Sequence, residues 1–452
     1  MRRIIKFLRN AIPDTHPIRL LYHKILAFLA AVRYWYPADK LIVVGVTGTN
    51  GKTTTVNLIT NVLNEAGYKV GMTSTINFQI ASKRWVNDTK QTTLGPFFLQ
   101  KMLRRMIKAG CRYAVLEVSS HSITQSRIYG VNIDIAVITN VSPEHVEYHG
   151  SFNNYLNTKG RLFQKVSKDT RKFGVPKVLI TNVDDKYYSF FDQFVADRKL
   201  TYGVKGGTVH CAEMDQKPEG THFILRVPNN SIPVDLRLPG EFNVANALAA
   251  AAVGISLQVP LDVIKKALDK SATVSGRFEH VDSGQKYSII VDYAHTPPAL
   301  ESLFSLYRKL TKGKLYAVFG ATGGGRDKSK RPEMGKIVDQ YADYIIVTDD
   351  DPYDENEWDI IDQVSKGISR EEGNNFWKIA DRREAIRLAL TLAKEGDCVV
   401  VAGKGCEEVI MLRGKRIPWN DKNVIKDLLE RPIEVEIHND HFEKRENVCL
   451  KS

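Results

Sequence analysis

The sequence predicts an α/β protein with two units, each built on a mostly parallel sheet. Short β-branched runs such as 113–120 and 133–142 alternate with segments of helical period, and each run ends in polar residues. The alternation stops near residue 276 and starts again at 287–297. Buried parallel strands joined by helices have this pattern, and their carboxyl ends carry functional side chains. The 452 residues are enough for two or three domains.

We expect three segments along the chain. Residues 1–38 form a short basic helical leader, 39–276 a central ATP-binding domain of the P-loop ATPase type, and 277–452 a Rossmann-like domain. The stretch from about 200 to 240 alternates apolar and polar residues, which predicts antiparallel strands at the edge of the central sheet. The segment "GEFNVANALAAAAVGISL" predicts a closely packed helix of small residues.

Positive charge is concentrated at one end of the chain. The formal net charge is +12, and residues 1–34 hold seven Lys or Arg against Asp14 alone. The rest is only mildly basic, which argues against a nucleic-acid groove, and no RNA or DNA recognition signature is present. The five cysteines form no Cys-x-x-Cys pair, so we expect reduced thiols in a cytoplasmic protein.

The leader contains the apolar segment "RLLYHKILAFLAAVRYWYP". Its apolar run is interrupted by His23 and Lys24, is shorter than the roughly 20 residues of a spanning helix, and has no cleavage site of small residues. Two interpretations stay open. The helix docks on the next domain, or it lies among lipid headgroups and gives the protein a peripheral contact with the inner membrane surface.

The segment "GVTGTNGKTTT", residues 45–55, predicts a phosphate-binding loop between a strand and a helix. Backbone N–H groups of the glycine turn and the helix start bind polyphosphate, Lys52 reaches the β and γ phosphates, and the Thr53 hydroxyl ligates Mg²⁺. Five residues separate Gly45 from Gly51, one more than in the general pattern. Glu117 ends one strand and His145 follows another, so both are candidate metal ligands beside the loop.

With these residues identified, the chain resembles the Mur ligase family of ATP-dependent amide ligases. It is most similar to the branch that adds the third residue of the peptidoglycan precursor peptide (MurE-type). The resemblance covers residues from about 41 to about 428 and includes nine motifs in the family's order: "GVTGTNGKTTT", "EVSSHSITQSR", "TNVSPEHVEYHGSFNNYLNTKGRLF", "GEFNVANALAA", "SGRFE", "VDYAHTPPAL", "GGGRDKSKRPEMG", "TDDDPYDEN" and "AGKGCEEVI".

The resemblance implies a two-step reaction. The carboxylate of a muramoyl-dipeptide attacks the γ-phosphate of ATP, and the amine of a free amino acid then displaces phosphate from the acyl phosphate. The amino acid is lysine, ornithine or diaminopimelate, and the product serves peptidoglycan synthesis and with it cell-wall formation, cell shape and cell division. We expect a cytoplasmic monomer that binds no nucleic acid.

The resemblance also implies the roles of individual residues. Two Mg²⁺ ions are held by Thr53 with Glu117 and by His145 with Lys159. Lys159 is carbamylated by CO₂, because a cation cannot ligate Mg²⁺. These ligands act in catalysis together with Lys52. ATP is bound by Gly48, Thr49, Asn50, Gly51, Lys52, Thr53, Thr54, Asn243, Asn246, Arg277, Asp292 and His295. The peptide and amino-acid substrates are bound by Thr92, Thr93, Ser119, Gln125, Arg127, Arg331, Asp350, Asp351, Tyr353, Gly403 and Glu407.

The chain departs from the family in two places that concern its substrates. Only 44 residues precede Gly45, too few for the family's N-terminal uridine-binding domain, so we expect that the acceptor is held with or without its UDP group by the remaining domains. Tyr353 stands where diaminopimelate-adding enzymes have an arginine, and Asp351 and Asp354 add negative charge. Both features favour lysine or ornithine over diaminopimelate.

Two alternatives remain open at the level of the sequence. The first is another amide ligase on the same scaffold, such as a folylpolyglutamate or cyanophycin synthetase. The second is a nucleotide-dependent P-loop scaffold that makes no covalent product. Glu117, His145 and Lys159 argue against the second, because a nucleotide sensor needs no second metal.

Overall fold

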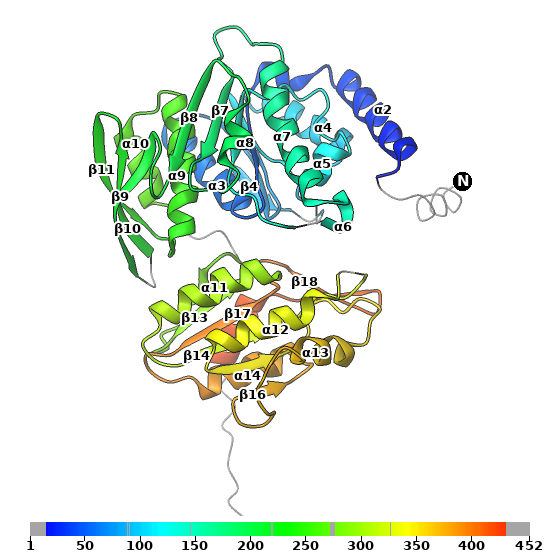
Figure 1. The fold of residues 1–452 in the computed structure, drawn as a ribbon, viewed down its shortest axis with the longest axis vertical. Helices are drawn as coiled ribbons and strands as arrows, with labels where there is room; N and C mark the ends of the chain where they lie inside the picture. The colour runs from blue at the N-terminus through cyan, green and yellow to red at the C-terminus, as the bar shows by residue number, and fades with distance from the viewer. Residues whose placement is uncertain are drawn as a thin grey trace, which may run out of the picture. The chain divides into compact units, whose positions relative to one another are not determined.

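The computed structural model describes residues 15–87, 89, 91–144, 146–217, 220–271, 276–325 and 327–430. The chain divides into two compact units, Met1–His280 with Asp292–Lys312 and Val281–Val291 with Gly313–Ser452. Helices cover mostly parallel sheets, which confirms the predicted α/β fold class (Figure 1). Within the described residues, no helix has both the length and the apolar character needed to cross a bilayer.

The first sheet has eleven strands in the described part of the chain. From one edge to the other they are β11 (Asn230–Leu236), β10 (Gly220–Val227), β9 (Val209–Lys217), β8 (Arg198–Gly203), β7 (Val178–Asn182), β6 (Ile135–Ile138), β1 (Ile42–Thr47), β5 (Tyr113–Glu117), β2 (Val70–Thr73), β3 (Asn77–Ile80) and β4 (Lys83–Val86). Neighbours from β9 to β2 run parallel. Antiparallel strands extend both edges, and β9 to β11 confirm the edge expected near residues 200–240.

Helices cover both faces of this sheet, as the alternating side chains of β1 require. Val44 and Val46 pack in one buried cluster with the helices α3 and α9, whereas Val43 packs in a second cluster on the opposite face. The helices of this region are α2 (Pro17–Arg33), η1 (Pro37–Lys40), α3 (Lys52–Glu65), α4 (Pro96–Lys108), α5 (Ser120–Thr124), α6 (Val146–His149), α7 (Phe152–Lys168), α8 (Tyr188–Asp192), α9 (Glu241–Ser256) and α10 (Leu261–Asp269).

The predicted small-residue helix is α9, and its alanines let it pack closely against α3. Ala247 and Ala249 to Ala252 are all fully buried. A run of alanines has no bulky side chain to hold two helices apart, so the two backbones approach closely. This packing brings the first turn of α9 beside the first turn of α3, where the phosphate loop ends.

The second sheet has six strands among the described residues, in the order β12 (Glu279–His280), β13 (Ser288–Asp292), β17 (Cys398–Ala402), β14 (Leu315–Phe319), β15 (Tyr344–Val347) and β16 (Phe376–Lys378). The pairs formed by β14, β15, β16 and β17 are parallel, as a Rossmann-like domain requires. The helices are α11 (Pro297–Leu310), α12 (Lys330–Tyr341), α13 (Glu357–Ser365), α14 (Arg382–Leu392) and α15 (Asp421–Glu430), and β18 (Val409–Leu412) pairs with β19 (Lys415–Pro418).

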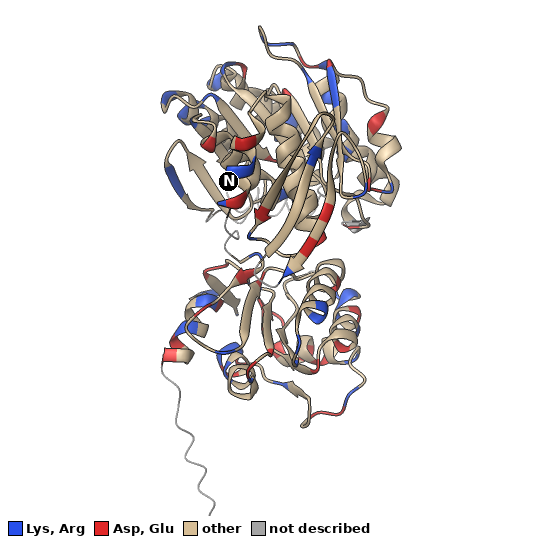
Figure 2. Ribbon diagram, turned by 90° about the vertical axis from the view of Figure 1, so that its left-hand side faces the viewer, with Lys and Arg blue, Asp and Glu red and all other residues tan. Residues whose placement is uncertain are grey.

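Acidic and basic residues are interspersed on both units in the view of Figure 2. This distribution agrees with a chain whose excess charge is concentrated near the N-terminus. The leader contributes α2 and η1 to the described structure, and residues 1–14 lie outside it.

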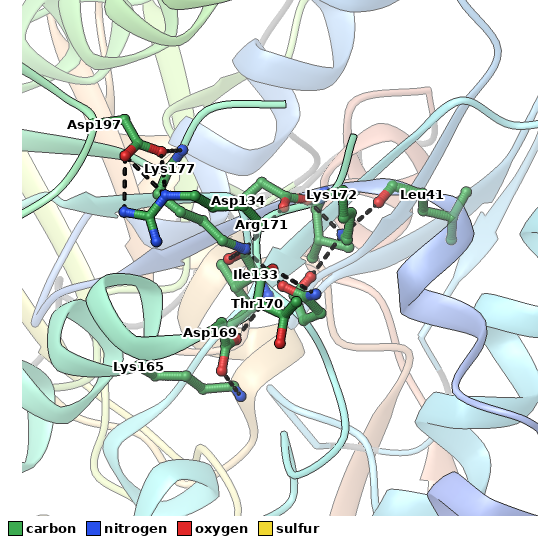
Figure 3. Close-up of polar contacts among 12 residues, drawn as sticks. Leu41, Ile133, Asp134, Lys165, Asp169, Thr170, Arg171, Lys172, Lys177 and Asp197 are labelled. Carbon is green, nitrogen blue, oxygen red and sulfur yellow. Dashed lines mark hydrogen bonds and ion pairs between the residues drawn. The ribbon is translucent and has the colours of Figure 1, made fainter. Parts of the chain in front are cut away.

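A buried ion-pair cluster holds the starts of the central strands together (Figure 3). Asp134 is fully buried and accepts from Lys177 Nζ at 3.0 Å, from Lys172 Nζ at 2.5 Å and from the Val43 backbone N–H at 2.9 Å. Lys172 Nζ also donates to the carbonyl oxygen of Leu41 at 2.6 Å. The cluster joins the amino-terminal ends of β1, β6 and β7, at the edge of the sheet opposite to the one where Glu117 and the loop after β1 lie.

Candidate functional site

The phosphate loop follows β1 and ends at α3, as predicted. Gly51 caps α3 with a left-handed φ of 80°, and a side chain there would lie 2.3 Å from Asn246 Oδ1. A Cβ at Gly48 would lie 1.7 Å from Thr139 Oγ1. Lys52 Nζ donates to the carbonyl oxygens of Gly48 at 3.1 Å and Thr49 at 2.7 Å. The loop is therefore closely packed, and the Lys52 ammonium and the start of α3 both lie beside it, which suits a bound polyphosphate.

The other predicted loop residues support the same loop. The Asn50 backbone N–H donates to Asn140 Oδ1 at 2.9 Å, and the Thr139 hydroxyl donates to the Asn50 carbonyl at 2.7 Å. Thr54 is buried in the first turn of α3. The polar residues that follow β6 thus fix the conformation of the loop that follows β1.

Glu117, the last residue of β5, lies at the centre of a hydrogen-bonded group beside the loop. Its Oε2 accepts from Thr53 Oγ1 at 2.9 Å and from the Thr75 backbone N–H at 2.8 Å. Its Oε1 accepts from Thr75 Oγ1 at 2.8 Å, and Thr92 Oγ1 lies 3.1 Å from the same Thr75 hydroxyl. Glu117 is only 1% exposed. A carboxylate and hydroxyls at a helix start are oxygen donors of the kind that Mg²⁺ prefers.

Lys159 on α7 reaches the same loop from the other side. Its Nζ donates to the Gly48 carbonyl oxygen at 2.6 Å and lies 4.4 Å from the centre of the Tyr155 ring. The Tyr155 hydroxyl in turn lies 3.0 Å from Thr49 Oγ1. Burial lowers the pKa of Lys159 well below its ordinary value, and the positive charge of Lys52 adds to this effect. The structure thus holds a lysine that favours its neutral amine at the phosphate loop.

The two predicted asparagines of α9 lie beside the first turn of α3. Thr55 Oγ1 donates to Asn246 Oδ1 at 3.1 Å, and Asn246 Nδ2 donates to Asn243 Oδ1 at 3.3 Å. Asn243 Nδ2 donates to the Pro239 carbonyl at 2.8 Å. Both amides are buried and fixed by protein groups. Of the two asparagines, Asn246 lies against the loop, because its side chain packs next to Gly51.

The predicted peptide-binding residues form a second group around the end of β5. Thr93 Oγ1 donates to the Glu117 carbonyl at 2.9 Å and accepts from the Ser119 backbone N–H at 3.0 Å. Arg127 donates to the Thr93 carbonyl at 2.7 Å and to Gln125 Oε1 at 2.9 Å. Thr93, Ser119, Gln125 and Arg127 therefore lie together, next to the backbone of Glu117.

Arg277, Asp292 and His295 also cluster. Asp292 is buried and its carboxylate accepts from two backbone N–H groups, at 2.7 and 2.8 Å. Burial raises the pKa of Asp292, while Arg277 acts against that rise. The Arg277 guanidinium lies 4.9 Å from the centre of the Tyr293 ring, which is 4.6 Å from the His295 ring. Arg277 Nε is buried and has no hydrogen-bond partner among the described residues, so it can still bind an anion.

In the second unit, acidic residues gather around a buried lysine that we did not predict. Lys404 Nζ donates to Asp351 Oδ1 at 2.8 Å and to Glu407, and lies 3.8 Å from Asp350 Oδ1. Gly403 has a φ of 114°, and a Cβ there would contact the Asp350 carboxylate. Four predicted residues are thus brought together at the ends of β15 and β17, with Lys404 among them.

Tyr353 lies on the loop after β15, and Arg331 lies in the first turn of α12. A Cβ at Gly324 would lie 2.7 Å from the Tyr353 ring, so the ring packs against the glycine-rich loop after β14. Arg331 is fully buried and donates to Glu355 at 3.1 Å. This contact, with Lys328, lowers the pKa of Glu355 to about 2. Asp351 and Glu355 are both paired, so the acidic run 349–355 is less negative than its residue count indicated.

One predicted metal ligand cannot be placed beside the loop. His145 lies outside the described residues. Within the described residues, no three His, Cys, Asp or Glu side chains lie close enough to hold a metal ion. Sequence reasoning also missed Thr75, Tyr155 and Lys404. Thr75 follows β2 and Lys404 follows β17, so the rule that selected Glu117 at a strand end could have selected both.

Family models match both units. The Mur ligase middle domain matches residues 46–254, and the Mur ligase, glutamate ligase domain matches residues 276–405.

Named relatives extend the match over most of the chain. It is 37% identical to the UDP-N-acetylmuramoyl-L-alanyl-D-glutamate–2,6-diaminopimelate ligase of Clostridium tetani, over 90% of this chain and 81% of the relative. It is 39% identical to the UDP-N-acetylmuramyl-tripeptide synthetase of Roseiflexus sp., over 88% of this chain and 80% of the relative.

Solved structures have the same fold. A UDP-N-acetylmuramoyl-L-alanyl-D-glutamate–2,6-diaminopimelate ligase is 32% identical, with a TM-score of 0.62, over 86% of this chain and 78% of the other. The folylpolyglutamate synthase of Mycobacterium tuberculosis, complexed with ADP, has a TM-score of 0.68 but only 16% identity, over 84% of this chain and 91% of the other. The second comparison shows similarity of fold alone.

Proposed function

The chain belongs to the Mur ligase family of ATP-dependent amide ligases, and from this premise we propose that it adds the third residue to a muramoyl-dipeptide. The acceptor carboxylate attacks the γ-phosphate of ATP, which releases ADP and forms an acyl phosphate. The amine of a free amino acid then attacks the acyl carbon, loses a proton and expels phosphate. The proposal includes a monomeric enzyme that works in the cytoplasm on a peptidoglycan precursor.

The buried lysine at the phosphate loop is the observation that carries this proposal. Lys159 Nζ lies 2.6 Å from the Gly48 carbonyl although 111 residues separate the two in sequence. Its lowered pKa favours the neutral amine, which is the form that attacks CO₂. The resulting N–C bond and the loss of one proton give a carbamate, with oxygens suited to a metal. A loop that only bound nucleotide would have no need of this group.

The chemistry of the donors fits the implied metal. Thr53 and Glu117 would hold one Mg²⁺, and His145 with the carbamate of Lys159 would hold a second. When bound, the ions neutralise charge on the attacking and leaving oxygens. Protein side chains bind the nucleotide. Lys52 lies against the loop and would bind phosphate, and Arg277, with its unpaired Nε, would supply a second cation for the nucleotide.

The second group of residues would hold the acceptor. Arg127 is fixed by Thr93 and Gln125 in a position next to Glu117, so its guanidinium would pair with a substrate carboxylate. The hydroxyls of Thr93 and Ser119 would orient the acyl chain. Positioning of this kind accounts for most of the catalysis that a phosphoryl-transfer enzyme provides.

The incoming substrate is a diamino acid, and we place lysine or ornithine ahead of diaminopimelate. Tyr353 packs against the glycine-rich loop and carries no charge for a second carboxylate. The pairing of Asp351 with Lys404 weakens the argument from negative charge, so the choice depends on Tyr353. Because relatives are named as diaminopimelate ligases, diaminopimelate is the amino acid against which lysine and ornithine must be compared.

The test is a product analysis. The full chain is incubated with ATP, Mg²⁺, a muramoyl-L-alanyl-D-glutamate acceptor with or without UDP, and one amino acid at a time. We expect ADP release that depends on both acceptor and amino acid, and a product whose mass corresponds to the tripeptide. ADP release without a new product would favour the nucleotide-dependent scaffold. Glutamate added to a folate would favour the folylpolyglutamate alternative.

A further inference from the structure

Helix α2 has an inner face of small residues that docks it on the first unit. Ala27, Ala30 and Ala31 are fully buried. The packing at Gly130 is so close that a Cβ there would lie 2.5 Å from Ala31 Cβ. The sequence left open whether this helix is docked or interfacial, and on its inner face it is docked.

The outer face of α2 is unusual, because it carries the large apolar side chains. Seven of them are between 45% and 65% exposed: Ile18, Leu21, Tyr22, Ile25, Phe28, Leu29 and Val32. Their spacing of three and four residues places them on one side of the helix. A helix on the surface of a globular protein normally turns its polar residues outward. Contiguous apolar patches of this kind mark sites of interaction.

The chain extends this patch just beyond the helix. Trp35 is 82% exposed, the second most exposed large hydrophobic residue in the described chain. Trp35 and Tyr36 both have positive φ, 57° and 45°, which are costly for residues with side chains. The two form the turn that leads from α2 towards β1, so the turn holds the indole outward. Tryptophan is enriched where an apolar phase meets water.

Cations predominate on α2 and on the helix packed beside it, and the nearest acid in the described residues that follow α2 is Asp39 on η1. Helix α2 carries Arg19, Lys24 and Arg33, and the adjacent helix α4 carries Lys101, Arg104, Arg105 and Lys108. Neither helix contains an Asp or a Glu. At about 100° per residue, Lys24 borders one side of the apolar face and Arg33 the other. Elsewhere the two signs are interspersed (Figure 2), so this single-sign region is a local feature.

We propose that the outer face of α2 lies in the plane of an anionic lipid surface and anchors the protein there. The apolar side chains enter the boundary between headgroups and acyl chains, and the surrounding cations bind lipid phosphates. The helix would not cross the bilayer. Synthesis of the amide bond does not depend on this contact, so the anchor is separate from the proposed ligase activity.

Other occupants fit the charge less well. A second copy of this chain, paired by a two-fold axis, would bring the same seven cations against themselves. Residues 1–14 carry Arg2, Arg3, Lys6 and Arg9 against Asp14, so they would add positive charge to a region that is already positive. An anionic lipid surface offers acyl chains for the apolar patch and negative charge for the cations of α2, of α4 and of residues 1–14.

The test is sedimentation of the full chain with vesicles of phosphatidylcholine, alone or mixed with phosphatidylglycerol. We expect binding to the mixed vesicles, weak binding to the neutral ones, and weaker binding as salt is raised. Trp35 should shift its fluorescence to shorter wavelength on binding. Absence of binding to the mixed vesicles at low salt would overturn the proposal.

Two matched double variants distinguish binding through α2 from non-specific adsorption of exposed apolar side chains to vesicles. The double substitution Leu21→Ser with Ile25→Ser should lower vesicle affinity at least about tenfold, because it removes two side chains from the apolar face. Phe173→Ser with Val195→Ser removes two apolar side chains elsewhere that are even more exposed, and it should leave affinity unchanged. Thermal unfolding and ADP release should be the same in both, so loss of the ligase reaction would not imitate loss of the anchor.

Two further outcomes would contradict the anchor. Equal loss of binding in both double variants would mean that the contact is not specific to α2. A concentration-dependent dimer that the Leu21→Ser, Ile25→Ser variant abolishes, without any vesicle binding, would identify a second copy as the occupant.

Discussion

Lys159 Nζ lies 2.6 Å from the carbonyl oxygen of Gly48, and Lys159 as a whole is only 1% exposed. A buried lysine is normally paired with a carboxylate, because an unpaired buried ammonium is costly. Among the described residues, Lys159 contacts a carbonyl oxygen and the ring of Tyr155. Burial and the Lys52 ammonium lower its pKa, and the Glu144 carboxylate opposes them without cancelling the effect. The environment therefore stabilises the neutral amine, the form that a carbamate requires.

The first prediction concerns this lysine. Lys159→Ala should lower the rate of amide synthesis at least about 100-fold, the size of effect seen when one positioned electrostatic group is lost. Short carboxylic acids such as acetate should restore part of the rate, because they can occupy the space of the carbamate. The rate is measured as ADP release that depends on the amino acid.

Lys165 provides the control for the first prediction. It lies on the same helix, is partly exposed and pairs with Asp169 at 2.9 Å. Lys165→Ala should leave the rate within about twofold, since exposed pairs contribute little. A Lys159→Ala enzyme at full speed, unaffected by acetate, would contradict the proposed role.

The second prediction concerns the carboxylate at the end of β5. Glu117 accepts hydrogen bonds from the Thr53 hydroxyl and from two donors of Thr75. Glu117→Gln loses the negative charge and one acceptor oxygen. The rate should fall about 100-fold or more, and half-maximal activity should require more Mg²⁺.

A carboxylate at the far end of α3 serves as the matched control. Glu65 pairs with Lys266 and Lys270. Glu65→Gln should change neither the rate nor the Mg²⁺ dependence. If Glu117→Gln loses activity only in proportion to a lower folded fraction, with an unchanged Mg²⁺ requirement, the residue has a structural role alone.

The sequence could predict some parts of this site and not others, for physical reasons. The glycine loop and Glu117 were predictable because both depend on local patterns, a tight turn before a helix and a polar residue at a strand end. The lysine at residue 159 was identified only through the family motif, since nothing in its local sequence indicates burial. The pairing of Asp351 with Lys404 was missed because it joins residues 53 positions apart. Counting acids in the run 349–355 therefore overstated the charge.

Helix α2 likewise shows which part of the fold the sequence could not predict. Its apolar residues were visible in the sequence, but which of them faces the protein was not. The alanines turn inward because Gly130 and α4 leave room only for small side chains, and the larger residues turn outward.

The third prediction tests the ion-pair cluster at the start of the central strands. Asp134→Ala leaves Lys172 and Lys177 buried without their carboxylate. Removing one partner of a buried pair costs about 3–5 kcal/mol, so the free energy of unfolding should fall by that amount. Urea unfolding measures it, and the activity of the remaining folded protein should be normal, because the cluster lies at the edge opposite to the phosphate loop.

An exposed pair gives the reference value for this experiment. Asp192 and Lys199 are 3.1 Å apart, with both side chains about 40% exposed. Asp192→Ala should cost less than about 1 kcal/mol. A similar cost for the two variants would mean that Asp134 is not the centre of the cluster.

The fourth prediction uses the pH dependence of stability. Burial raises the pKa of Asp349 to about 7, and the Glu357 carboxylate adds to the rise against the attraction of Arg382. The unfolded chain binds this proton only near the ordinary carboxyl pKa of about 3.9. Between about pH 4 and pH 7 the folded state therefore holds more protons, so its stability falls as pH rises through this window.

Asp349→Asn should consequently raise the melting temperature at pH 8.5, where the natural side chain is a partly buried anion. At pH 5.5 the natural carboxyl is mostly protonated, and the gain from the amide should shrink. Asp362→Asn on α13 controls for the loss of one negative charge from the same unit. Thermal unfolding of the three proteins at both pH values gives the comparison. If Asp349→Asn raises the melting temperature equally at pH 5.5 and pH 8.5, the Asp349 carboxyl does not titrate between these pH values. The stability that the wild-type protein lacks would then not come from burying a negative charge.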